Sequence, residues 1–152
     1  MPEDVRLKKL AGHLLLMAQA GQYNFPRIAQ RGEKAAAQLA AFEFVKSTLE
    51  VIFLLNRDYM PFYKWSFRAM RDLLFLSDLE QPLYSIMTTD NEPENAEDKY
   101  IKIERICATV IGELQRQNIT KAFCSDLEKH AYSVNDMITN STVRNLNIFY
   151  AV

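Results

Sequence analysis

Residues 33–56 carry the sequence EKAAAQLAAFEFVKSTLEVIFLLN, which is apolar on nearly every side of a helix. A helix that is apolar all round usually lies at the centre of its domain. Its strongly polar residues are few, and Glu43, Lys46 and Glu50 fall with Arg57 on one narrow stripe, because successive residues turn by about 100° around a helix. The segment therefore predicts a central helix whose charged stripe faces either an opening or paired charges.

The segments around this helix also show helical periodicity rather than strand alternation. Before it, apolar residues recur at helical spacing from Pro2-Glu3-Asp4 to about Ala20, and Gly21 is placed to end that helix. Phe25 precedes a proline and is expected to be extended in a loop, and a second helix starts near Pro26. The remaining predicted segments are helices at Tyr63–Leu76, Ser77–Met87, Asp98–Gln117 and Phe123–Thr139, with a solvent-exposed linker at Thr88–Glu97.

The composition is that of one ordinary globular domain. Of 152 residues, 49% are hydrophobic and 24% are charged, and only 4 glycines and 5 prolines are available for turns. So few turn-forming residues favour long helices over a many-stranded sheet. We therefore expect residues 1–152 to form a single all-α, up-and-down bundle of five or six helices. The apolar tail that contains Leu146, Ile148, Phe149 and Tyr150 is expected to pack on this bundle.

Charge and special residue types argue against several classes of function. A net charge of −1 gives no global attraction for nucleic acid, so any anion site must be a local cluster. Cys107 and Cys124 lack metal-ligand spacing and are expected to be buried free thiols in a cytoplasmic protein. His13 and His130 are expected at core or boundary positions. The strongest apolar run, Val51–Leu55, is much shorter than the ~20 residues that span a membrane.

The densest group of cations and aromatic rings follows the central helix. Guanidinium and ammonium groups can hold phosphate, and rings can stack on a base or sugar. Because the short Asp58–Phe62 connection makes two helices antiparallel neighbours, we expect Lys46, Arg57, Lys64 and Arg68 to converge on one concave surface. The alternative is that the rings are core and the cations a solvated face. The substrate-binding candidates are Glu43, Lys46, Arg57, Tyr59, Tyr63, Lys64, Trp65 and Arg68, with Tyr23, Asn24 and Arg27 as secondary candidates for which ordinary turn chemistry is the alternative.

The segments Gln38–Lys46 and Phe53–Arg71 resemble the domain of unknown function 4037, and so do Gly21–Arg27 and Val143–Tyr150. That family follows a nucleotidyltransferase domain in bacterial proteins, and it is similar to the helical substrate-binding domain of antibiotic nucleotidyltransferases and, more loosely, to HEPN bundles. The resemblance implies an accessory domain that lines a nucleotide or phosphorylated-substrate site beside a catalytic domain, in the same chain or a separate one. It implies no catalytic residue, metal ligand or cofactor in this chain, while the assembled enzyme would bind a magnesium nucleotide.

The catalytic half of such an enzyme is not expected within residues 1–152. Nucleotidyl transfer needs acids that converge on divalent cations, and the chain has no Gly-Ser loop followed by Asp-x-Asp. We therefore do not expect this chain alone to be an enzyme. A HEPN-like ribonuclease is a weaker alternative, because neither Arg116 nor Arg144 is followed several residues later by the histidine of that motif. An interaction or homodimerisation bundle is the other alternative, since the aromatic surface and the apolar tail would serve it.

Overall fold

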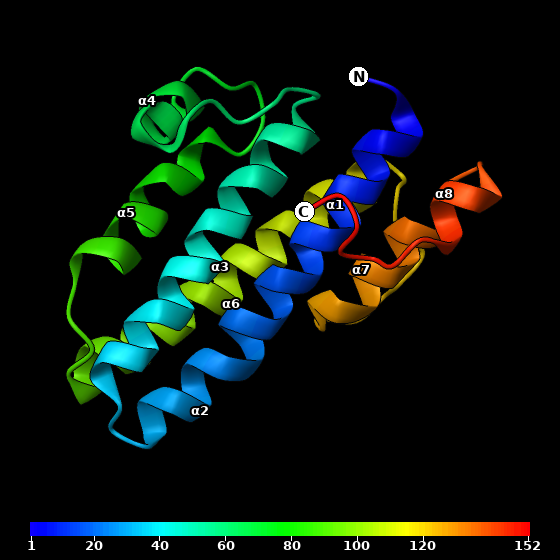
Figure 1. Cartoon of the computed structure of the whole chain (residues 1–152). Coiled ribbons are helices and arrows are strands. Elements are labelled where there is room, and N and C mark those ends of the chain that lie inside the picture. Colours follow the sequence, from blue (N-terminus) through cyan, green and yellow to red (C-terminus); the bar gives the residue numbers. More distant parts are fainter.

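The structure, a computed structural model that describes residues 1–152, consists of helices and connecting turns and contains no strand (Figure 1). The α-helices and their bounds are α1 (Glu3–Met17), α2 (Phe25–Gln30), α3 (Lys34–Leu55), α4 (Ser66–Met70), α5 (Glu80–Thr88), α6 (Pro93–Arg116), α7 (Leu127–Asp136) and α8 (Ser141–Asn145). A π-helical segment spans Ala18–Asn24, and short 3₁₀ turns span Tyr63–Trp65 and Ser77–Leu79. The predicted all-α bundle is confirmed.

Helix α3 lies between α1 and α5, with α6 packed behind it (Figure 1). Its side chains from Val51 to Leu55 are all buried, as are Phe44 and Val45. On the other side of α1, α7 and α8 complete the bundle. The central position predicted for residues 33–56 is therefore confirmed, and it follows from the apolar character of that helix. None of the helices combines the length and hydrophobicity needed to cross a membrane.

The first helix does not end at Gly21, which corrects the sequence prediction. The chain continues through the π-helical segment directly into α2, and Phe25 is helical at φ −54° and ψ −54°. The physical reason is close packing at Gly21, where a β-carbon would lie 2.2 Å from Cδ1 of Phe44 and 2.9 Å from Cγ2 of Ile103. Glycine therefore serves here as a contact point for α3 and α6, not as a helix end.

The predicted helix Tyr63–Leu76 is also wrong in extent, since only Ser66–Met70 is α-helical. Asn56, at the end of α3, accounts for the early end of this helix. Its side-chain amide donates to the carbonyl of Phe75 at 2.9 Å, and its Oδ1 accepts from the backbone N–H of Phe75 at 2.9 Å. This pair of hydrogen bonds draws Phe75 back to the end of α3, and Leu76 then takes φ +65°.

The predicted solvent linker Thr88–Glu97 is shorter than expected, because α6 begins at Pro93. Within it, Asn91 is buried and donates to the carbonyl of Lys34 and to Oε1 of Gln38, both at 3.0 Å. The last long helix begins at Leu127 instead of Phe123, because Asp126 caps it by accepting from the N–H of Glu128 at 3.0 Å.

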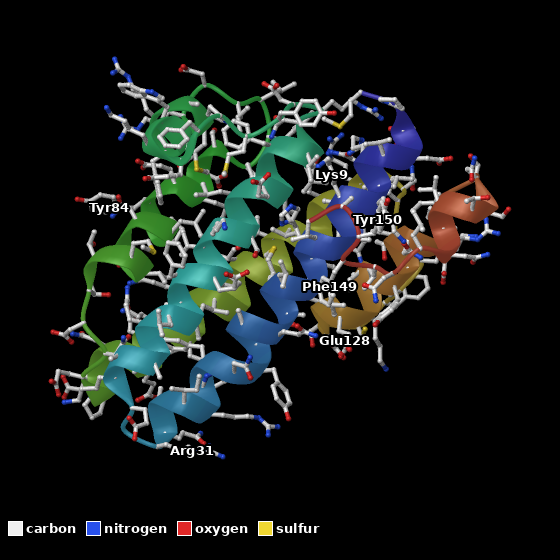
Figure 2. The ribbon with its side chains drawn as sticks, in the orientation of Figure 1. Lys9, Arg31, Tyr84, Glu128, Phe149 and Tyr150 are labelled. Atoms are coloured by element: carbon white, nitrogen blue, oxygen red, sulfur yellow. The ribbon has the colours of Figure 1, made fainter.

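The C-terminal tail packs on the bundle, as predicted. Phe149 and Tyr150 lie over α1 (Figure 2). Gly12 of α1 has the tail directly against it, since a β-carbon there would lie 2.4 Å from Cγ2 of Val152. The buried ammonium of Lys8 donates to the carbonyls of Arg144 at 3.3 Å and Leu146 at 2.6 Å. Helix α1 therefore contacts both the central helix α3 and the C-terminal tail.

Candidate functional site

A hollow of about 470 Å³ lies between α3 and the segment that follows it. The α3 face at this point carries apolar side chains with Lys46 among them, and Tyr63 closes the opposite side. Two of the predicted site residues, Lys46 and Tyr63, thus line the same hollow. Its lining residues are Phe42, Val45, Lys46, Leu49, Met60, Tyr63, Ser66, Phe67 and Met87.

Three of the predicted cations carry no ion pair. Lys46, Lys64 and Arg68 are exposed, and their side chains make no salt bridge or hydrogen bond with the rest of the chain. Arg71, by contrast, is neutralised by Glu80 at 3.1 Å. The surface near the hollow therefore keeps unpaired positive charge, which is the property that an anion site requires.

The predicted aromatic side chains are open to solvent. Tyr63 is 73% exposed, and its ring lies 4.4 Å from that of Phe62. The Lys64 ammonium lies 5.2 Å from the centre of the Trp65 ring, within the range of a cation–π contact. Tyr59 is exposed as well. Trp65 is exposed too, so these rings do not form part of the core, which was the alternative for them.

Arg57 lies apart from Lys46. It lines a separate hollow of about 310 Å³ beside Phe75 and Arg116, and its guanidinium pairs with Glu3 at 2.9 Å. Helix α3 ends at Leu55 and Arg57 follows it with φ +59°, so the helical stripe of Lys46 does not extend to Arg57. The four cations therefore do not all converge on one concave surface.

A second group of titratable side chains lies where α1 packs on α3. Burial raises the pKa of Glu50, while the charges of Lys9 and Lys46 act in the opposite direction. Burial, reinforced by the same two lysines, lowers the pKa of His13 to about 4. The Nδ1 atom of His13 is buried and has no hydrogen-bond partner. Lys46 thus lies between the group formed by Glu50 and His13 and the apolar hollow. The candidate Glu43 is half-buried.

The secondary candidates lie at a different place, on the π-helical segment and the start of α2. Arg27 stacks on the Tyr23 ring, with Cζ 3.8 Å from its centre, and Asn24 is exposed. Tyr23 lines a hollow of about 570 Å³ whose other side carries Glu104, Asp126 and Glu128. The sequence pattern did not point to these acids, because Glu104 lies on α6 while Asp126 and Glu128 lie at the start of α7, and no local motif joins the two places.

Gln22 connects the elements around the hollow that Tyr23 lines. Its side-chain amide donates to Glu104 at 3.3 Å and to the carbonyl of Ser125 at 3.0 Å, and its Oε1 accepts from the N–H of Leu127 at 3.0 Å. Burial and the neighbouring Glu104 raise the pKa of Tyr100, which also lines the hollow.

The histidines and cysteines do not line any of the three hollows described above. His130 is buried, with its ring nitrogens 2.8 Å from Oγ1 of Thr120 and 2.7 Å from the carbonyl oxygen of Cys124, which confirms a core position. Cys107 is a buried free thiol whose pKa is raised by burial, and Cys124 is free and half-buried. No group of three or more His, Cys, Asp or Glu side chains is placed to hold a metal ion.

Comparison with known proteins gives one match. Residues 1–66 match the model of a family described as a domain of unknown function, DUF4037, which confirms the resemblance inferred from sequence over that part of the chain. The matched residues include the π-helical segment, all of α3 and the candidates from Tyr23 to Trp65. Neither the curated proteins nor the solved structures contain a match to this chain.

Proposed function

We propose that this chain is a helical accessory domain for a nucleotidyltransferase-type catalytic domain, and that the hollow on α3 lines a nucleotide or phosphorylated-substrate site between the two. One observation carries the proposal: Lys46 and Tyr63 line an apolar hollow near cations that have no ion-pair partner. Rings can stack on a base, and ammonium or guanidinium groups can hold a phosphate. Both hollow-lining candidates lie within the segment that matches the family model.

In this proposal the two partners divide the chemistry. The acids and the magnesium ion needed for metal-assisted nucleotidyl transfer belong to the catalytic domain. The present chain, which we place in the bacterial cytoplasm and compare loosely with HEPN bundles, binds and orients the substrate. Lys64 and Arg68 lie on the segment that closes the hollow, where they can add positive charge.

Co-expression with a catalytic domain that is encoded beside or fused to this chain tests the proposal. We expect transfer of labelled nucleotide to require both domains. A Lys64→Gln/Arg68→Gln variant should raise KM about tenfold with little change in kcat, because these cations contribute binding of charged groups. Lys121→Gln, an exposed lysine on another surface, is the control. A transfer rate that is equal with and without the chain would exclude an accessory role.

A second candidate, self-association, is favoured by the large apolar side chains that α3, α5 and the segment between them leave exposed. Monomeric proteins rarely leave large contiguous apolar patches open. Sedimentation at several concentrations would detect a dimer, and Phe62→Glu should abolish it. A monomer at all concentrations would remove this candidate. The exposed side chains concerned are Leu39, Phe42, Phe62, Leu74 and Tyr84.

A further inference from the structure

The lining of the α3 hollow restricts the kind of molecule that it can hold. Its volume of about 470 Å³ lies within the roughly 300–1,000 Å³ of small-molecule sites. Phe42, Tyr63 and Phe67 supply aromatic surface, while Lys46 and Ser66 are the polar contributors besides the Tyr63 hydroxyl. A sugar phosphate would bring several hydroxyl groups into this space and leave most of them without partners, which is costly.

The polar groups of the hollow are not equally available. The Ser66 hydroxyl already donates to the carbonyl of Tyr63 at 2.8 Å. Lys46 donates to no group of the protein, although it is on the same stripe as Glu43 and Glu50. Its ammonium is therefore the one charged donor that a ligand in the hollow can use without displacing an existing bond. A negative group on the ligand would satisfy it best.

We infer that the α3 hollow binds the flat ring of an aromatic anion, with Phe42, Tyr63 and Phe67 around the ring and Lys46 on the anionic group. The inference rests on the proposed function and narrows its substrate to phosphates that carry an aromatic ring, as distinct from sugar phosphates that lack one. Nucleotides and aryl phosphates share this chemistry, and the probes below separate them.

Trp65 provides a direct signal, because it is the only tryptophan and lies two residues from Tyr63. Its fluorescence, excited at the red edge of its absorption, would be followed while the intact chain is titrated with phenyl phosphate, adenosine 5′-monophosphate, benzyl alcohol or ribose 5-phosphate. Methyl NMR of Met60 and Met87, which line the hollow, provides a second signal independent of Trp65. We expect both aromatic phosphates to bind, and tighter binding of one of them identifies the class.

The anionic group and the aromatic ring of the ligand should contribute separately to its affinity for the hollow. We expect benzyl alcohol to bind about tenfold more weakly than phenyl phosphate, the factor expected for one charge-assisted hydrogen bond, and ribose 5-phosphate not to bind in the same range. Lys46→Gln should weaken the binding of phenyl phosphate by about tenfold and leave the binding of benzyl alcohol unchanged. Lys34→Gln, on the same helix but outside the hollow, is the matched control and should change neither.

The outcomes separate this inference from the proposed function. Absence of any response in both signals, equal binding of ribose 5-phosphate, or equal effects of Lys46→Gln and Lys34→Gln would each overturn the inference. The accessory role would survive those results if nucleotidyl transfer still required the chain. Ring-dependent binding that depends on Lys46, with no dependence of transfer on the chain, would retain the aromatic-anion site and overturn the accessory role.

Discussion

Lys99 of α6 is a buried cation with no carboxylate partner, and its ammonium contacts α3 and the segment before α6. The residue is 1% exposed, and its ammonium donates to Oε1 of Gln38 at 3.1 Å, Oδ1 of Asn91 at 2.8 Å and the carbonyl of Thr89. Burial lowers its pKa. Three neutral oxygens in the protein thus replace the water that an exposed lysine would have.

We expect Lys99→Met to lower the free energy of unfolding by about 3 kcal/mol, because the three oxygens lose their shared donor inside the protein. Lys102→Met is the matched control on the same helix. Lys102 is half-buried, pairs with the exposed Asp98 and donates to the Ser85 hydroxyl at 3.0 Å, and loss of such a partly exposed ion pair costs about 1 kcal/mol or less. Urea unfolding followed by circular dichroism measures both. Equal losses would show that the Lys99 bonds add little.

His13 makes stability depend on pH. Its pKa of about 4 in the folded chain lies below the ordinary value of 6.5, so the unfolded chain binds the proton more readily. The contribution of neutral His13 to the free energy of unfolding is therefore fully present above about pH 6.5 and is lost as pH falls through the folded pKa near 4. The shift corresponds to about 3 kcal/mol at most. Burial of Glu50 acts in the opposite direction, since a raised carboxyl pKa favours the protonated form in the folded state.

Comparison with His13→Leu isolates this effect, because other titrating groups are present in both proteins. Urea midpoints would be measured between about pH 7 and pH 4.5. We expect the wild type to lose more stability than the variant over this interval. Parallel curves for the two proteins would mean that His13 is not the titrating group.

Among the elements, the π-helical segment packs closely on α3 and α6 at Gly21. Gly21→Ala places a methyl group against Phe44 and Ile103, so we expect a loss of about 1–3 kcal/mol through overpacking. Gly112, on α6, has open space around its β-position, and Gly112→Ala should instead stabilise by about 0.5–1 kcal/mol through helix propensity. Thermal unfolding of the two variants gives the comparison. A destabilised Gly112→Ala with an unaffected Gly21→Ala would contradict it.

The elements that sequence predicts well are those whose packing their own pattern dictates. The apolar stretch Val51–Leu55 identifies a central helix, and the periodicity of residues 98–117 identifies α6. The elements that it predicts poorly depend on distant partners. Gly21 has the local signature of a helix end, and only the approach of Phe44 reveals its other use. Residues 71–76 have helical periodicity, but hydrogen bonds to Asn56 give them another conformation.

The same distinction applies to the candidate site. Lys46 and Tyr63 were predictable because a short connection joins their elements, which places the two residues on one hollow. Sequence spacing predicts Arg57 on the helical stripe of Lys46, yet α3 ends at Leu55, and the salt bridge of Arg57 to Glu3 depends on where α1 begins, which spacing within α3 cannot give. The hollow that Tyr23 lines was only partly predicted, since Glu104 and Asp126 join it through the fold alone.

At the scale of the whole molecule, Lys8 connects the two ends of the chain. Its ammonium is buried and donates to Oδ1 of Asn135 at 2.9 Å and to the carbonyls of Arg144 and Leu146. Asn135 in turn donates to the carbonyl of Arg144 at 3.1 Å. The tail carbonyls therefore accept from one donor on α1 and one on α7, and the tail also packs against Gly12.

We expect Lys8→Met to release the segment from α8 to Val152 before it affects the centre of the bundle. Amide exchange in residues 141–152 should accelerate by about tenfold or more, since local opening no longer breaks the Lys8 bonds. The amides of α3, whose core contacts are unchanged, should keep most of their protection. Lys9→Met is the matched control, because Lys9 gives the tail a single bond, to the carbonyl of Ala151 at 3.3 Å. If both variants accelerate exchange equally, or if α3 loses protection together with the tail, the tail is not a separate unit held by Lys8.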